Sequence, residues 1–355
     1  MHRGEGAAPD PRALVVALSV VLLVALSAGC GSPGSAGPAA GAENVGPAVA
    51  APPSAPFAVV LGTAQDGGVP HAGCDGPRCE AARRDPARRH RVASLGIVVP
   101  HADGGPAAAY LVDATPDLVD QLHDLRRLAG EPPVGGVDRT PLAGIFLTHA
   151  HMGHYLGLAH LGFEAASARG VTAWATPRMA AFLRENAPWD QLVELGNVEL
   201  AEIEPGEGRP GRPVELGAGV SVASLAVPHR DEYSDTVAYV VRGPRAALLY
   251  VPDTDGWDRW PTPLEEVLAE VDVALLDGTF YSLDELPGRD VSQVRHPLIA
   301  HTVERLTPLV EGGGPRVLFI HLNHSNPALD PATPERRAIE AAGFGVAKDG
   351  RVLPL

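Results

Sequence analysis

Residues 144–154 read Gly-Ile-Phe-Leu-Thr-His-Ala-His-Met-Gly-His, an apolar run that leads directly into three histidines. The apolar run predicts a strand, and His149, His151 and His154 would lie where that strand gives way to a helix. Neutral imidazole is the commonest protein nitrogen ligand for zinc and similar ions. Two histidines separated by one residue can converge on one ion while the third serves a neighbouring position. This stretch therefore predicts a hydrolytic metal centre.

Three further apolar runs end in residues of the metal-binding kind. These residues are His229, Asp253 and His321, each directly after its own predicted strand. Histidine and carboxylate ligands at several strand ends suit a metal site better than isolated surface histidines do. The sequence therefore supplies a full set of candidate ligands.

In this order the residues resemble the pattern of the metallo-β-lactamase superfamily, which is H-x-H-x-D-H, a distant His, an Asp and a final His. The resemblance covers most of residues 57–355. It implies an α+β fold, a four-layer αββα sandwich of two mixed sheets flanked by helices. It also implies a divalent metal, zinc first with manganese or iron as alternatives, in one or two ions.

The same resemblance implies a role for each candidate residue. His149, His151 and His229 would hold one ion, while His154 and His321 would hold a second, with Asp253 bridging the two. It assigns catalytic roles to His229 and to Asp253, which would orient the attacking water.

One position departs from the family pattern, because the aspartate of the first motif is Gly153 here. Glycine can neither coordinate an ion nor accept a proton from water. Three alternatives follow: a weaker second ion, a single ion, or a protein that binds without catalysing. If the second position is merely incomplete, Gly153→Asp should raise the metal stoichiometry or the hydrolytic rate. Asp277, which also ends an apolar run, is either a further ligand or a turn cap.

Residues 57–70 form a predicted strand and a Gly-rich turn, and two cysteines, Cys74 and Cys79, follow it. This region resembles the branch that contains the pyrroloquinoline-quinone biosynthesis B-type proteins and the phosphonate-pathway cyclic phosphodiesterase. In that branch a cysteine cluster and a late histidine form a structural zinc site, which implies Cys74, Cys79 and His324 here. The cysteine pair could equally form a disulfide in an oxidising compartment.

The N-terminal part has the composition of a targeting segment. Arginines precede the apolar residues 13–28, and small residues lead to Cys30, as in a lipoprotein signal peptide. We expect residues 1–30 to be this signal, 31–56 to be a flexible Gly/Ala/Pro/Ser linker, and 57–355 to be the metallo-β-lactamase-fold domain. Cys30 would be lipidated, which predicts an extracytoplasmic protein anchored to the bacterial cell membrane. Alternatives are an uncleaved anchor or ordinary signal-peptidase cleavage.

The formal net charge of −15 argues against a nucleic-acid partner, because phosphate backbones require a basic surface. A small anionic substrate is the expected partner. The basic residues between 83 and 91 are interpreted either as a solvated helix face or as an anion-binding group. His123, His160, His296 and His301 lack evident partners in the sequence and are interpreted as surface or hydrogen-bonded histidines.

Hydrophobic patterns predict the elements of the sandwich. The predicted strands are 57–63, 92–100, 107–113, 144–148, 171–175, 221–227, 236–242, 246–252, 272–277 and 316–321. The predicted helices are 116–129, 154–169, 177–186, 262–269, 297–311 and 333–342.

The sequence thus predicts a metal-dependent hydrolase of a small anionic ester, such as a phosphodiester, that uses metal-activated water. Two alternatives stay open. One is an iron-dependent oxidase or oxygenase related to quinone-cofactor biosynthesis, since histidines with a carboxylate suit non-haem iron. The other is a non-catalytic carrier of a metal or ligand, which the glycine at position 153 suggests.

Overall fold

Two mixed seven-stranded sheets form the centre of the structure, a computed structural model that describes residues 52–286, 288 and 294–355. The first sheet has the order β14 (Val352–Pro354), β1 (Phe57–Gly62), β2 (Ser94–Val99), β3 (Ala108–Val112), β4 (Gly144–Phe146), β5 (Val171–Ala175), β6 (Val198–Glu202). The second has the order β13 (Gly345–Val346), β12 (Arg316–Ile320), β11 (Val273–Asp277), β10 (Ala247–Val251), β9 (Val237–Arg242), β8 (Val220–Ala226), β7 (Val214–Gly217).

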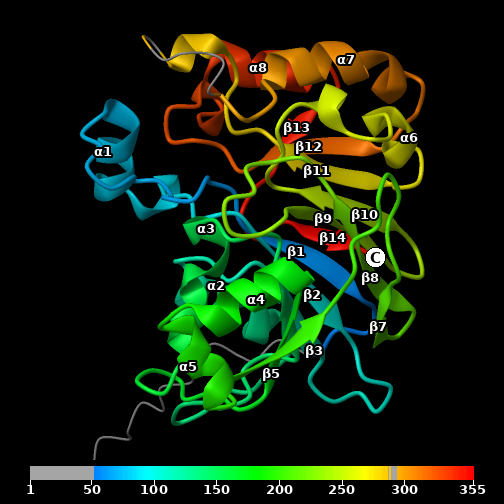
Figure 1. Ribbon diagram of the computed structural model, residues 1–355. Helices are drawn as coiled ribbons and strands as arrows, with labels where there is room; N and C mark the ends of the chain where they lie inside the picture. Colours follow the sequence, from blue (N-terminus) through cyan, green and yellow to red (C-terminus); the bar gives the residue numbers. More distant parts are fainter. Residues whose placement is uncertain (1–51, 287, 289–293) are drawn as a thin grey trace, which may run out of the picture. The chain divides into compact units, whose positions relative to one another are not determined.

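Helices cover the outer face of each sheet (Figure 1). The helices are α1 (Pro77–Arg84), α2 (Leu118–Leu128), α3 (Met152–Tyr155), α4 (Pro177–Glu185), α5 (Trp189–Glu194), α6 (Leu264–Leu268), α7 (Ile299–Glu311) and α8 (Pro334–Ala341). Apolar residues of α2, α4 and α5 pack on the first sheet, and those of α6, α7 and α8 pack on the second. The predicted four-layer α+β sandwich is therefore confirmed.

A third apolar cluster lies between the two sheets and fixes how they meet. Phe146 of β4 is fully buried there; its ring stacks on Trp174 at 4.5 Å and meets the edge of Tyr239 at 5.5 Å. Aromatic pairs of this kind add to the stabilisation from burial. Phe146 is one of only three residues in β4. Its packing therefore fixes the position of the segment that leads to the histidine motif.

Strand direction explains why the polar residues gather. Strands β3, β4, β5 and β6 run parallel in the first sheet, and β10, β11, β12 and β13 run parallel in the second. Carboxyl ends of parallel strands meet at one edge of a sheet, which is where α/β proteins place ligands. Residues that follow β10 and β12 therefore share one edge of the second sheet, and the packing of the two sheets brings His154, after β4, against Asp253, after β10.

Every predicted strand is present with small shifts at its ends, but one predicted helix is wrong. Residues 154–169 hold the last two residues of α3 and a 3-10 helix over Leu156–Leu161, which ends at the extended Gly162. Beyond it, Ser167 adopts a positive φ of 45°, which a helix does not allow. Several short elements went unpredicted, namely β6, β7, β13, β14, α1 and α5.

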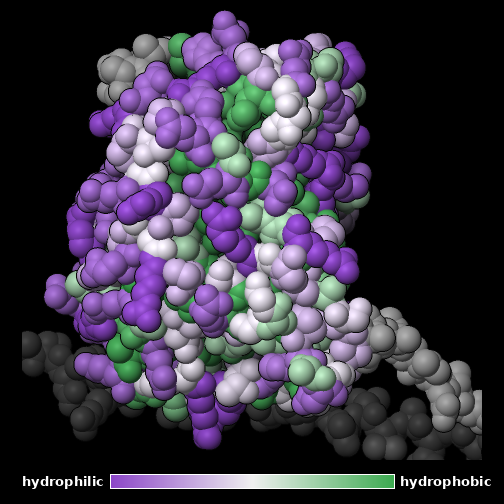
Figure 2. All heavy atoms as spheres, turned by 90° about the vertical axis from the view of Figure 1, so that its right-hand side faces the viewer, coloured by the Kyte–Doolittle hydropathy of each residue, from purple (hydrophilic) through white to green (hydrophobic). Residues whose placement is uncertain are grey.

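One face of the molecule, seen in Figure 2, is mostly hydrophilic, with hydrophobic residues in smaller separate groups. Within residues 52–286, 288 and 294–355, no helix combines the length and apolar character that crossing a membrane requires. The predicted signal peptide with Cys30, and most of the predicted linker, lie outside the described residues.

Candidate metal centre

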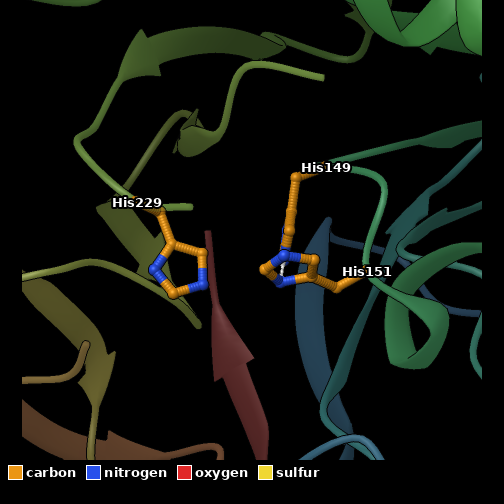
Figure 3. A group of neighbouring side chains, drawn as sticks. All are labelled: His149, His151 and His229. Atoms are coloured by element: carbon orange, nitrogen blue, oxygen red, sulfur yellow. Dashed lines mark hydrogen bonds between the residues drawn. The ribbon is translucent and has the colours of Figure 1, made fainter. Parts of the chain in front are cut away.

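The first group of candidate ligands consists of three histidines from both sheets (Figure 3). His149 and His151 follow β4, and His229 follows β8 and faces them from the second sheet. The His149 Nε2 and His151 Nδ1 atoms are 2.8 Å apart, and one nitrogen from each of the three rings lies within 4.8 Å of the others. The three residues that the sequence assigned to one ion are therefore close enough to share it.

The second group surrounds Asp253, which follows β10. Its Oδ2 lies 2.9 Å from His154 Nε2, 3.2 Å from His321 Nε2 and 3.7 Å from His149 Nε2. Its Oδ1 lies 3.7 Å from His229 Nε2. Asp253 therefore stands between the two groups of histidines, where a bridging carboxylate is expected.

One carboxylate of this second group was not predicted. Asp66, from the loop after β1, places its Oδ1 3.3 Å from His154 Nε2 and 3.7 Å from His321 Nε2. The sequence carries no metal-binding signal for it, since Asp66 lies in a Gly-rich turn and follows no predicted strand directly.

The donor atoms fit a divalent metal. Four of them are buried and have no hydrogen-bond partner among the described residues: Asp66 Oδ1, His154 Nε2, Asp253 Oδ2 and His321 Nε2. Buried polar atoms are normally hydrogen-bonded, so four buried atoms without a hydrogen bond at one point indicate ligands of a cation. Two carboxylates and two imidazoles on one point form the nitrogen and oxygen donor set that zinc and related ions bind.

Polar residues behind the ligands hold the rings in place. Asp113 Oδ2 lies 2.7 Å from His154 Nδ1, and Thr148 Oγ1 donates to Asp113 and lies 2.9 Å from His149 Nδ1. Thr279 Oγ1 lies 3.0 Å from His321 Nδ1. Such partners orient the coordinating nitrogen of a ligand histidine. Asp113 has a φ of 67°, a strained conformation for a non-glycine residue that often marks a functional site.

His296 also lies at the centre, so of its two interpretations, surface or hydrogen-bonded, the structure agrees with the second. Its Nδ1 lies 2.9 Å from Asp277 Oδ2 and 3.6 Å from Asp253 Oδ1. Asp277 caps a turn as well, since its Oδ1 accepts from the Thr279 backbone N–H at 2.9 Å. No strand pattern precedes His296 in the sequence, and only the folded chain brings it to the centre.

The pKa values of the histidines in the centre are shifted in opposite directions. Burial, the largest influence, lowers the pKa of His149 well below its ordinary value and that of His229 to about 4. Burial acts the same way on His154, but Asp113, Asp253 and Asp66 outweigh it and raise the pKa of His154 well above its ordinary value. His149 and His229 are therefore neutral at pH 7, while His154 carries a proton in the metal-free protein.

We expect uptake of an ion at His154 to release about one proton, because a histidine must be neutral to coordinate. Since the pKa of His154 is raised, affinity at this position should increase as the pH rises above 7. Affinity at His149, His151 and His229 should change little over the same range, because burial lowers the pKa of each of these histidines. Calorimetric zinc titration in two buffers of different ionisation enthalpy measures the proton release. Uptake of the second ion without proton release would contradict this expectation.

The cysteine region takes one of its two predicted forms. Cys74 and Cys79 are joined by a disulfide, and the His324 ring stacks on His71 at 4.3 Å beside it. Zinc on Cys74, Cys79 and His324, the alternative prediction, would require both cysteines as free thiolates and so excludes this disulfide.

The basic cluster lies apart from the metal ligands. Arg88, Arg89 and His90 line a cavity of about 760 Å³ together with Arg78, Arg336 and Lys348. Arg83 and Arg84 form ion pairs with Glu80 within α1. The cluster is therefore divided between a helix face and a cavity wall.

Known proteins resemble this chain in sequence and in fold. Residues 109–322 match the family model of the beta-lactamase superfamily domain. Coenzyme PQQ synthesis protein B of Methylobacterium sp. strain 4-46 is 30% identical over 84% of this chain and 99% of its own length. The crystal structure of zinc-bound PqqB from Methylobacterium extorquens has a TM-score of 0.68 at 24% identity, and covers 84% of this chain and 100% of that one. A diphosphatase of the PhnP family has a TM-score of 0.57 at 21% identity, with 84% and 98% covered.

These relatives correct one prediction. The synthesis protein B of strain 4-46 is matched over 99% of its length by 84% of this chain, and its name denotes neither a lipoprotein nor a membrane protein. The prediction of a lipid-anchored membrane protein is therefore wrong. An extracytoplasmic location stays a prediction.

The family model spans more than half of the chain, and the relative from strain 4-46 is similar over nearly its whole length. Both place the strand-end histidines within a shared fold. The chain therefore belongs to the metallo-β-lactamase-fold superfamily, in the branch of the coenzyme PQQ synthesis protein B relatives.

Proposed function

We propose that the protein is a metal-dependent hydrolase of a small anionic ester of the phosphodiester type. The proposal rests on the position of Asp253, whose two carboxylate oxygens face histidines on either side. A carboxylate in this place can serve two neighbouring ions, and paired ions suit hydrolysis of phosphate esters.

The residues of the centre would have different roles in hydrolysis. His149, His151 and His229 would hold the first ion, and His154, His321 and Asp253 would contribute to the second. When bound, such ions lower the pKa of water and stabilise negative charge on a phosphoryl oxygen. Asp253 would orient the attacking water through its Oδ1, on the side of His229. Asp113 would keep His154 directed at the centre.

Cationic side chains beside the ligands support an anionic substrate. Arg230 places a guanidinium nitrogen 3.3 Å from His151 Nε2, and its side chain is half exposed. Arg295, also partly exposed, lies 3.1 Å from Asp255, whose Oδ1 is 3.4 Å from His229 Nδ1. One guanidinium group can donate two parallel hydrogen bonds to a phosphate. These arginines could therefore hold the ester against the ions.

Chelation provides the direct test. The protein purified with its own metal should hydrolyse bis(p-nitrophenyl) phosphate, lose this turnover after dialysis against a chelator, and regain it with zinc or manganese. His151→Ala should abolish turnover, while His301→Ala, at an exposed position on α7, should leave it unchanged. Metal-loaded protein without turnover on phosphodiesters would contradict the proposal.

A second candidate is an iron-dependent oxidase or oxygenase that acts in the synthesis of coenzyme PQQ. It is favoured by the relatives, which carry that coenzyme in their names and match 84% of this chain. Histidines with a carboxylate also suit non-haem iron. Iron bound on purification, with oxygen consumption and no phosphodiester hydrolysis, would support this candidate over the hydrolase.

The carrier alternative depended on the missing aspartate at position 153. Its support is weaker now that another carboxylate, Asp66, lies beside His154. Retained metal affinity without turnover on any tested ester or with oxygen would be needed to restore it.

A further inference from the structure

We propose that Asp66 supplies the metal-binding carboxylate that position 153 cannot supply, and that it completes the second ion position. The full set would be Asp66, His154, Asp253 and His321. This inference rests on the metal centre of the proposed function, but it concerns how the ion is held and not which ester is cleaved.

Asp66 lies directly against Gly153 and leaves no space for a side chain there. A Cβ atom built on Gly153 would lie 2.1 Å from Asp66 Oδ1, 2.6 Å from Asp66 Cα and 2.9 Å from Asp66 Cβ. Asp66 therefore fills the volume into which any side chain at position 153 would project. Gly153 lies inside α3 with an ordinary backbone conformation, so glycine is needed there for space and not for a positive φ.

Asp66 also faces the two histidines of the second ion position. Its Oδ1 is buried, accepts no hydrogen bond from the described residues, and faces His154 Nε2 and His321 Nε2 at 3.3 and 3.7 Å. Asp253 Oδ2 reaches the same two nitrogens at 2.9 and 3.2 Å. Two carboxylate oxygens and two imidazole nitrogens directed at one another form the oxygen and nitrogen donor set that zinc and related ions bind.

The backbone shows that Asp66 is held there by the fold. The preceding Gln65 donates its N–H to the Leu322 carbonyl at 2.9 Å, and Leu322 donates to Thr63 at 2.9 Å. Gly68 closes the turn by donating to Gln65 at 2.8 Å. The loop that carries Asp66 is therefore bonded to the residue directly after His321, so the two candidate ligands are positioned by one backbone unit.

In this chain the second carboxylate therefore comes from a loop at the start of the domain and not from the histidine motif, and the glycine at position 153 leaves room for it. The earlier expectation that Gly153→Asp adds a ligand is reversed, because its side chain would meet the main chain of Asp66. Both Gly153→Asp and Gly153→Ala should displace Asp66 and weaken the second ion.

The test counts ions and does not depend on an enzyme assay. After equilibration with buffered zinc, elemental analysis should find two ions per chain in the natural protein and in Asp75→Asn, a control at an aspartate whose side chain is 96% exposed. Asp66→Asn should retain one. Its second ion should bind more than about 100-fold more weakly, since residues behind a ligand already contribute 10–100-fold. Cobalt substitution should show the loss as one missing set of visible absorption bands.

Further measurements keep the outcomes separate. The metal-free Asp66→Asn protein should keep the circular dichroism spectrum of the natural protein, so that loss of an ion cannot be explained by loss of the fold. Two zinc ions retained in Asp66→Asn, or fewer than two ions in the natural protein, would overturn the inference. Loss of one ion in Asp66→Asn would support it even if no phosphodiester were hydrolysed, a result that contradicts only the proposed hydrolase.

Discussion

Asp253→Asn should empty both ion positions and lower the turnover of bis(p-nitrophenyl) phosphate by about 10³-fold or more. The carboxylate lies within 3.7 Å of ring nitrogens of five histidines, and the amide would keep the shape while removing the charge; the histidines are His149, His154, His229, His296 and His321. Charge stabilisation by bound ions is worth several kcal/mol, which corresponds to a rate factor of this size.

The measurement pairs turnover with elemental analysis of the same sample. Asp258→Asn is the matched control, because its side chain is 96% exposed and contacts Arg305 at the surface. This control should keep both ions and full turnover. If Asp253→Asn kept its ions and its rate, Asp253 could not be the residue that joins the two positions.

Phe146→Ala should reduce the free energy of unfolding by about 3–5 kcal/mol, the usual range for removing a buried aromatic side chain. Phe146 is fully buried between the sheets, and its ring contacts Trp174 and Tyr239. Urea unfolding of the metal-free protein measures the effect without the stabilisation that bound ions add.

Phe163→Ala is the control for this change, since that side chain is 67% exposed and should alter the unfolding midpoint little. Because β4 leads directly to Thr148 and His149, Phe146→Ala should also weaken metal binding. A loss of stability below about 1 kcal/mol would show that the space between the sheets closes around the missing ring.

Most residues that the structure brings together here could be predicted because they follow apolar runs. A buried strand is a strong local signal, and His149, His229, Asp253 and His321 all follow such strands. The short or exposed strands left no such signal. In β7 the residues alternate between half-buried and exposed, and β13 has only two residues.

Asp66 and His296 could not be found in the same way. Asp66 lies in a turn beyond the end of β1, and His296 precedes α7 in an irregular segment. Each reaches the centre through contacts between distant parts of the chain, such as the Gln65–Leu322 hydrogen bond. The sequence shows that position 153 offers no side chain to a metal, but only the packed structure shows that Asp66 lies against this glycine.

The division of the ligands between the two sheets has a consequence for folding. His149, His151 and His154 follow the first sheet, while His229, Asp253 and His321 follow the second. Neither half alone offers a full coordination shell, and unfolded chains rarely present a preformed site. The ions would therefore bind only after the two sheets have packed together. Once bound, they would cross-link the two sheets and oppose their separation.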